Sequence, residues 1–143
     1  MIYEEAPTIS TMSNKWKNEG RFSKYYKWTT QEKASITTLD KLILSYGLPK
    51  FCKIDVEGFE ESVLKGLTKP IPFISFEFTR EFFDDAKKCV DYLYQLGYVK
   101  FNFSLGESKK FLFQKWIAPD ELYKKIADLV DPLLWGDIYA RFL

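Results

Sequence analysis

The sequence predicts an α/β fold with a short parallel sheet that an antiparallel β-hairpin closes at one edge. Two largely apolar runs, at 51–56 and 73–78, alternate with segments of helical periodicity, which is the pattern of βαβ units. From residue 99 the apolar residues recur with a period of two, as in an antiparallel strand. With 143 residues, 46% of them hydrophobic, the chain can bury a sizeable core, so we expect a single domain.

Residues 1–36 form an irregular segment in which basic and aromatic residues alternate, and at most one short helix is predicted there. Residues 37–143 form the α/β part. Its first helix is well delimited, because Thr37 is a suitable N-cap, Gly47 a suitable C-cap, and Pro49 follows. The run "FCKIDV" at 51–56 then predicts a strand, and the apolar spacing of residues 58–67 predicts a second helix.

The second half of the α/β part repeats this order. The run "FISFEF" at 73–78 shows little alternation, as expected of a parallel strand covered on both faces. Thr79 is a plausible N-cap for a helix that ends at Gly97. The alternation from Val99 to Ser104, the turn-rich "LGESKK" and the run "FLFQKWI" predict a β-hairpin over 98–117. A last helix is predicted from Pro119 to about Asp131, before the apolar end "LLWGDIYARFL".

Composition excludes several function classes. A net charge of +1 provides no field that favours nucleic acid or an anionic membrane, so we expect neither partner. No apolar run approaches the ~18 residues of a membrane span, and we expect a cytoplasmic protein. The chain has no histidine, which removes Ser-His-Asp and Cys-His catalysis and HExxH zinc sites. Cys52 and Cys89 are expected to be buried free thiols.

Polar side chains follow both predicted parallel strands. Asp55, Glu57 and Gly58 come after the first strand, and Glu77 lies late in the second. Ligands of open α/β sheets bind beyond the carboxyl ends of the strands, so these residues mark the candidate site. Lys53 lies inside the first strand, where burial requires a partner, and we expect an ion pair with a carboxylate such as Glu77, or a role in the site.

Several segments resemble the C-terminal half of the FkbM-family methyltransferases, which use S-adenosylmethionine. The segments that carry the resemblance are "TTLDKLI", "KIDVEGFEESVLKGL", "ISFEF", "LGYVKFNFS" and "WGDIYA", and "STMSNKW" with "GRFSKYYKW" resembles the preceding stretch. The resemblance implies a doubly wound, Rossmann-like methyltransferase sheet of strand order 3-2-1-4-5-7-6. The two parallel strands and the hairpin would correspond to strands 4 to 7, so we expect a partial sheet that lacks strands 1–3.

In such an enzyme, the chemistry of methyl transfer to a hydroxyl and the lack of histidine suggest a role for each candidate residue. Asp55 is expected to be the general base that takes the proton of an acceptor hydroxyl, and Glu57 to orient substrate or ligate a divalent cation. Lys53, Gly58 and Glu77 are expected to bind substrate. Two alternatives remain open: Asp55 caps the following helix, and Gly58 serves a tight strand-to-helix turn.

The family's glycine-rich cofactor turn has no counterpart here, since the seven glycines are dispersed and no GxG occurs. We therefore predict an S-adenosylmethionine-dependent O-methyltransferase of a sugar or other small hydroxylated metabolite, truncated and inactive alone, whose binding of the cofactor is doubtful. The alternative is a non-catalytic α/β scaffold or self-association module. Without strand 1, "FCKIDV" would be an exposed edge, so we expect homo-oligomers formed through the strand-4 edge.

Overall fold

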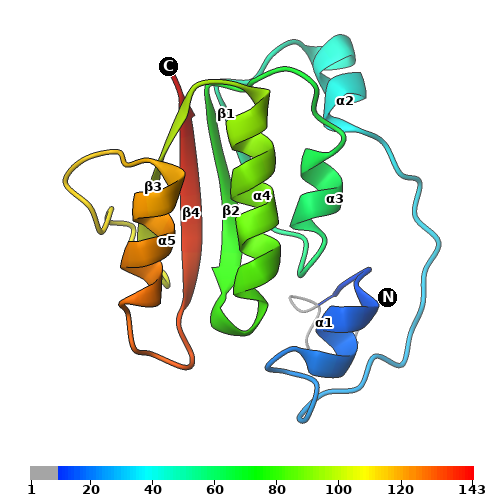
Figure 1. Cartoon of the computed structure of the whole chain (residues 1–143). Helices are drawn as coiled ribbons and strands as arrows, with labels where there is room; N and C mark the ends of the chain where they lie inside the picture. The colour runs from blue at the N-terminus through cyan, green and yellow to red at the C-terminus, as the bar shows by residue number, and fades with distance from the viewer. Residues whose placement is uncertain (1–9) are drawn as a thin grey trace.

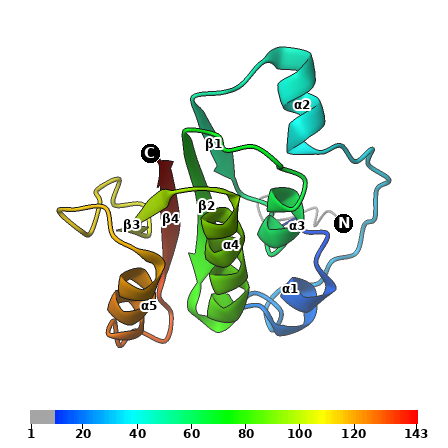
Figure 2. The same cartoon turned by 45° about the horizontal axis from the view of Figure 1, so that its top comes forward.

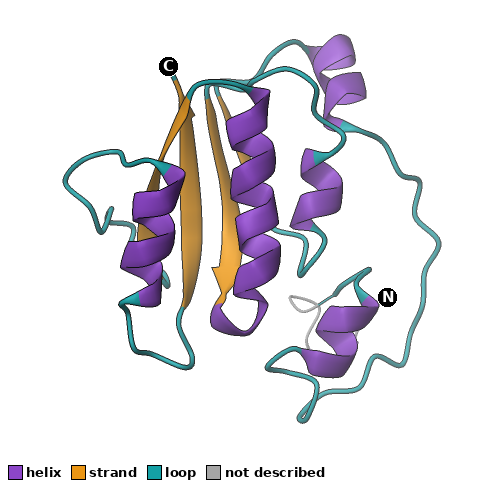
Figure 3. Ribbon diagram, in the orientation of Figure 1, coloured by secondary structure: helices purple, strands orange, loops and turns teal. Residues whose placement is uncertain are grey.

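The structure is a computed structural model that describes residues 10–143 (Figures 1 and 3). The described chain alternates helices and strands. In order, these are α1 (Asn14–Glu19), α2 (Leu39–Tyr46), β1 (Phe51–Ile54), α3 (Glu60–Leu64), β2 (Phe73–Thr79), the 3-10 turn η2 (Arg80–Phe82), α4 (Phe83–Leu96), β3 (Val99–Leu105), α5 (Pro119–Ala127) and β4 (Trp135–Phe142).

The four strands form one sheet in the order β1-β2-β4-β3. Strands β1 and β2 are parallel, and β4 is antiparallel to both β2 and β3. The α/β fold class is therefore confirmed. The order also equals the 4-5-7-6 order that the resemblance implies, with strand 7 as the antiparallel member.

The hairpin predicted over 98–117 is wrong in its second strand. The partner of β3 is β4, at the C-terminus, and residues 111–117 add only an isolated bridge between Phe101 and Ile117. The apolar end of the chain forms this central strand because it pairs with β2 on one side and β3 on the other. In β4, Gly136, Ile138 and Ala140 are buried and alternate with more exposed residues, so burial has a period of two. The sequence does not reveal this period, because the run is short and apolar residues occur on both faces.

Helices α3, α4 and α5 lie together on one face of the sheet (Figure 1). Alternate residues of the strands point into this layer, and Ile74, Phe76, Phe101, Phe103 and Ile138 are almost completely buried in the core. The side chain of Arg80 donates to the carbonyls of Ile126, Leu129 and Asp131, which closes the C-terminal end of α5. Within the described residues, no helix combines the length and apolar character needed to cross a bilayer.

The opposite face of the sheet carries the polar members of the alternation. Loop 106–116 packs on part of it, where Phe111 meets Tyr139 and Trp116 meets Phe73. The same stretch covers the outer edge of β3, since Phe101 and Ile117 exchange backbone hydrogen bonds. This edge is therefore protected in the manner expected of sheet edges.

Strand β1 forms the other edge of the sheet, and in the described part of the chain it pairs only with β2. Helix α2 precedes it and stands apart from the other helices (Figure 2). Thr38, rather than Thr37, caps α2, and Asp40 fixes the helix by accepting hydrogen bonds from Thr68. Of the two cysteines, Cys89 is buried as expected, whereas Cys52 on β1 is only half-buried.

Candidate functional site

A sharp turn links β1 to α3 and gathers acidic side chains at the end of the sheet. Glu57 and Gly58 both have positive φ, of 50° and 87°, so the chain reverses over two consecutive left-handed residues. The Glu60 carboxylate accepts from the amides of Val56 (3.3 Å) and Gly58 (3.2 Å), which holds this turn in place. Gly58 thus serves the strand-to-helix turn, which was one of the two alternatives for it.

Asp55, Glu57 and Glu77 lie together at the carboxyl ends of β1 and β2, as the parallel pairing predicts. Each offers one carboxylate oxygen, and these oxygens lie within 4.8 Å of one another. Asp55 is exposed, and the other two are half-buried. Asp55 does not cap α3, since the N-cap residue is Phe59 and no side chain bonds there.

The two half-buried carboxyls hold their protons unusually strongly. Burial, together with repulsion from Glu77 and Asp55, raises the pKa of Glu57 to about 8. Burial and the charges of Asp55 and Glu60 raise the pKa of Glu77 to about 7. A carboxylate with a pKa near the working pH is a far stronger base than an ordinary one and can still lose its proton, so Glu77 is poised for proton transfer near neutral pH.

Lys53 pairs with a carboxylate, but its closest partner is not Glu77. Its ammonium bonds the carboxylate of Asp137 on β4 and lies 3.7 Å from Asp55. Burial would lower the pKa of Lys53, but the bond to Asp137 outweighs it and raises the pKa. The expected pair with Glu77 is therefore wrong as a contact, because β4 occupies the position beside β2 and brings Asp137 within reach.

A cavity of about 360 Å³ adjoins the carboxylates, between α1, the start of α3 and the first half of α4. Glu77, Thr79 and Gly58 line it, whereas Asp55 and Glu57 do not. Glu77 is thus the carboxylate that belongs to both the acidic cluster and the cavity. Thr79, expected to cap a helix, makes no capping bond, and its buried Oγ1 has no hydrogen-bond partner among the described residues.

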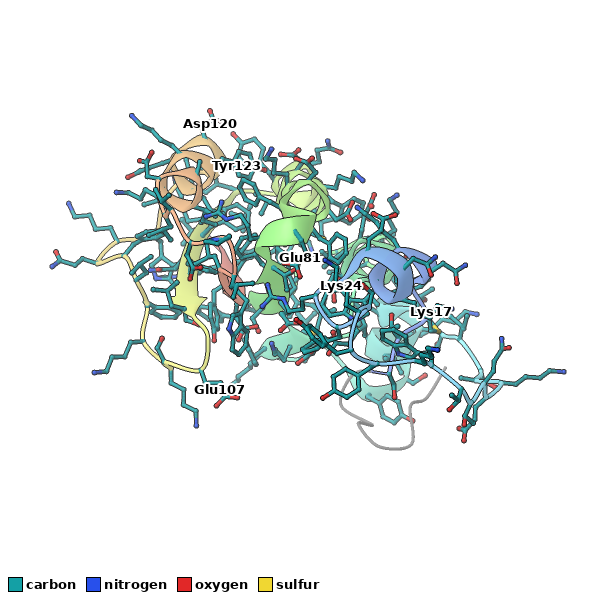
Figure 4. All side chains as sticks on the ribbon, turned by 90° about the horizontal axis from the view of Figure 1, so that it is seen from below. Lys17, Lys24, Glu81, Glu107, Asp120 and Tyr123 are labelled. Carbon is teal, nitrogen blue, oxygen red and sulfur yellow. The ribbon has the colours of Figure 1, made fainter. Side chains whose placement is uncertain are left out.

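The N-terminal segment forms one wall of the cavity, to which residues 12–16 contribute. Thr11 donates a hydrogen bond to the Glu57 carbonyl (2.6 Å), and Lys15 pairs with Asp85 on α4 (2.5 Å). Arg21 forms a two-pronged pair with Glu81, at 2.8 and 2.7 Å. Figure 4 labels Glu81, Lys17 and Lys24 where this segment meets the start of α4.

Sequence reasoning missed Asp137, Trp16 and Thr79. Asp137 lies in "WGDIYA", near the apolar end of the chain, and its position opposite Glu77 depends on the unpredicted strand β4. Thr79 lies at the end of β2. Trp16 joins the site because α1 docks beside η2 and α4, where Trp16 meets Phe82 and Lys15 pairs with Asp85. A tryptophan beside an N-cap serine, Ser13, was the available signal for that helix.

The acidic cluster defines which residues could hold a metal. Carboxylate oxygens are the ligands that Mg²⁺ and Ca²⁺ prefer, so a divalent cation bound by the described residues would be held by Asp55, Glu57 and Glu77. Lys53 lies beside Asp55 and would compete with such an ion.

Comparison with known proteins identifies a family. A family model described as "Methyltransferase FkbM domain" matches residues 4–100. No curated protein and no solved structure matches the chain.

Proposed function

Because the chain belongs to the FkbM methyltransferase domain family, we propose that residues 51–79 form the acceptor side of an O-methyltransferase site. The acceptor is a sugar or another small hydroxylated metabolite. It lies in the cavity, and Glu77 takes the proton of its hydroxyl group. The observation that carries this proposal is the position of Glu77, at the end of β2, in the cavity lining and beside two other carboxylates.

Membership of a methyltransferase family implies S-adenosylmethionine as the methyl donor in general. The described residues do not fit this cofactor by themselves. The turn after β1 holds Gly58, but its amide already donates to Glu60, and no glycine-rich turn follows β2. The proposal therefore assigns to these residues only acceptor binding and proton transfer, and no step uses a metal.

Glu77 is a better candidate for the base than Asp55. A general base must reach the proton that it removes, and of the two only Glu77 is among the residues that line the cavity. Asp55 lies beside Lys53 and is exposed, so it contributes its negative charge. That charge favours the protonated form of Glu77, as expected of a base that must hold the proton it receives.

Replacement of Glu77 by glutamine should weaken acceptor binding by about 10-fold, because the amide cannot accept a charge-assisted hydrogen bond from a hydroxyl. Saturation-transfer NMR with a panel of free sugars and small polyols measures this on the whole chain. Glu107→Gln, on an exposed loop, is the matched control. Two outcomes would contradict the proposal. In one, the folded protein binds no member of the panel; in the other, the Glu77→Gln variant binds the panel as well as the original chain.

The exposed edge of the sheet supports a second candidate function, a self-association module. Leu44 and Tyr46 on α2 are 88% and 86% exposed, and Phe51 on β1 is 50% exposed. An unpaired strand edge beside apolar side chains recruits a further strand, and a second copy can supply its own β1 about a two-fold axis.

This second candidate predicts a dimer at high protein concentration. Sedimentation velocity should show the sedimentation coefficient rising with concentration, and Phe51→Lys should suppress the rise, since an edge lysine opposes pairing. A chain that sediments as a monomer at every concentration would rule the module out and leave the methyltransferase proposal unaffected.

A further inference from the structure

The cavity beside α1 is large enough for a small ligand and has mixed walls. Its volume of about 360 Å³ lies at the lower end of the range for small-molecule sites. Four aromatic residues contribute to the lining: Trp16 from α1, Phe59 before α3, Phe78 on β2 and Phe82 before α4. Trp16 and Phe82 contact each other with ring centroids 5.4 Å apart.

Two polar groups in this lining are buried without a partner among residues 10–143. Trp16 is 4% exposed and Thr79 is 6% exposed, and neither Trp16 Nε1 nor Thr79 Oγ1 has a hydrogen-bond partner in that part of the chain. A buried polar group without a partner costs about 1–3 kcal/mol. Two such groups on one cavity therefore point to an occupant that supplies an acceptor for the indole N–H and a partner for the hydroxyl.

The charged side chains of the lining favour an occupant with a positive charge. Four carboxylates and one lysine line the cavity: Glu60, Glu61, Glu77, Asp85 and Lys15. Asp85 is neutralised by Lys15 and Lys88, and Glu61 pairs with Lys65. No ion pair is present for Glu77 among residues 10–143, so its charge has no direct counterion within the cavity.

The aromatic residues of the lining also favour a positively charged occupant. The face of an aromatic ring attracts cations, and Lys15 already lies over the Phe82 ring, 4.9 Å from its centroid. A ligand that carries both an ammonium group and hydroxyl groups would satisfy the free carboxylate, the rings and the two unpartnered polar atoms together.

We propose that this cavity binds a hydroxylated organic amine of the size of an amino sugar. Its ammonium group bonds one oxygen of the Glu77 carboxylate and the reacting hydroxyl bonds the other, a second hydroxyl accepts from Trp16 Nε1, and a third bonds Thr79 Oγ1. This inference deepens the proposed function and rests on it, because it names the class of acceptor. It also gives α1 a role, since Trp16 from this helix then contacts the ligand directly.

The test uses the four indole N–H resonances of the whole chain labelled with ¹⁵N-tryptophan. Glucosamine is the probe, and glucose and N-acetylglucosamine are its uncharged counterparts. We expect glucosamine to shift the resonance that disappears in Trp16→Phe, while the resonances of Trp28, Trp116 and Trp135 stay in place. Its apparent Kd should be about 10-fold lower than that of either neutral sugar.

Two variants locate the ammonium group and the hydroxyl. Glu77→Gln should raise the apparent Kd of glucosamine to that of glucose, and Thr79→Val should weaken all three sugars alike. Glu107→Gln, far from the cavity lining, should change none of them.

Two results would overturn the inference. Equal binding of glucose and glucosamine would remove the preference for a cation, and the proposed function would stand with a neutral acceptor. Absence of any Trp16 shift up to about 50 mM glucosamine would show a cavity filled by water only. The proposed function fails separately, when no hydroxylated compound binds in a manner that depends on Glu77.

Discussion

Gly136→Ala should destabilise the chain by on the order of 3 kcal/mol or more, or prevent folding, which is among the largest effects expected of a single substitution. Gly136 lies on β4, opposite Phe78 of β2 and Leu105 of β3. A Cβ at this position would lie 1.9 Å from the carbonyl oxygen of Ser104, a distance that no packing adjustment of side chains relieves. Because the Cβ is fixed to the backbone of β4 and the oxygen belongs to the backbone of β3, the β3–β4 ladder must open to separate them.

Urea unfolding of purified protein, followed by circular dichroism, measures this effect. Gly97→Ala is the matched control, since Gly97 has extended backbone and its added Cβ would meet its nearest neighbours at an ordinary 3.5 Å. We expect the control to stay within about 1 kcal/mol of the original chain. A Gly136→Ala protein with an unchanged unfolding midpoint would show that β4 does not lie between β2 and β3.

Glu57→Gln should make the chain more stable than the original at pH 8 and above. The Glu57 carboxyl, with a pKa raised to about 8, and the Glu77 carboxyl, with a pKa raised to about 7, bind protons more tightly in the folded state than at their ordinary value of 4.5. Between pH 4.5 and about pH 8 the unfolded chain therefore binds fewer protons than the folded chain, and the free energy of unfolding falls as the pH rises through this range. Glutamine does not ionise, so the Glu57→Gln variant lacks the loss of stability that the ionisation of Glu57 causes as the pH rises.

The expected gain is on the order of 1–2 kcal/mol at pH 8, after allowance for the partial exposure of the Glu57 carboxyl. Paired carboxylates such as Asp85, whose pKa is lowered by Lys15 and Lys88 against the effect of burial, act in the opposite direction and only at acidic pH. Thermal unfolding at pH 5 to 9 separates the two effects. If the unfolding temperature depends on pH in the same way for Glu57→Gln, Glu107→Gln and the original chain, this account is contradicted.

Local patterns predicted most of the helices and the parallel strands. The Gly47 and Gly97 helix ends and the runs at 51–56 and 73–78 are encoded within a few residues, and the structure has elements there. Strand β4 was not predicted, because its two partners are distant in sequence and its short run ends the chain. A strand in the middle of a sheet is specified by the neighbours that it pairs with, and no local period reveals them.

The residues of the candidate site were likewise predicted only in part. Asp55, Glu57 and Glu77 could be placed together from the sequence, because the carboxyl ends of neighbouring parallel strands meet at one edge. The partner of Lys53 could not, since Asp137 comes from the unpredicted strand. The contribution of Trp16 depends on how the N-terminal segment docks, which composition alone does not determine.

The most direct test of the account is the titration of the glutamate side chains by ¹³C NMR of the carboxyl carbons. The account requires a site at the ends of β1 and β2 that is poised for proton transfer near neutral pH. We expect Glu57 and Glu77, assigned by their glutamine variants, to titrate near pH 8 and pH 7. Titration of both carboxyls near the ordinary value of 4.5 would contradict the site and the function proposed for it.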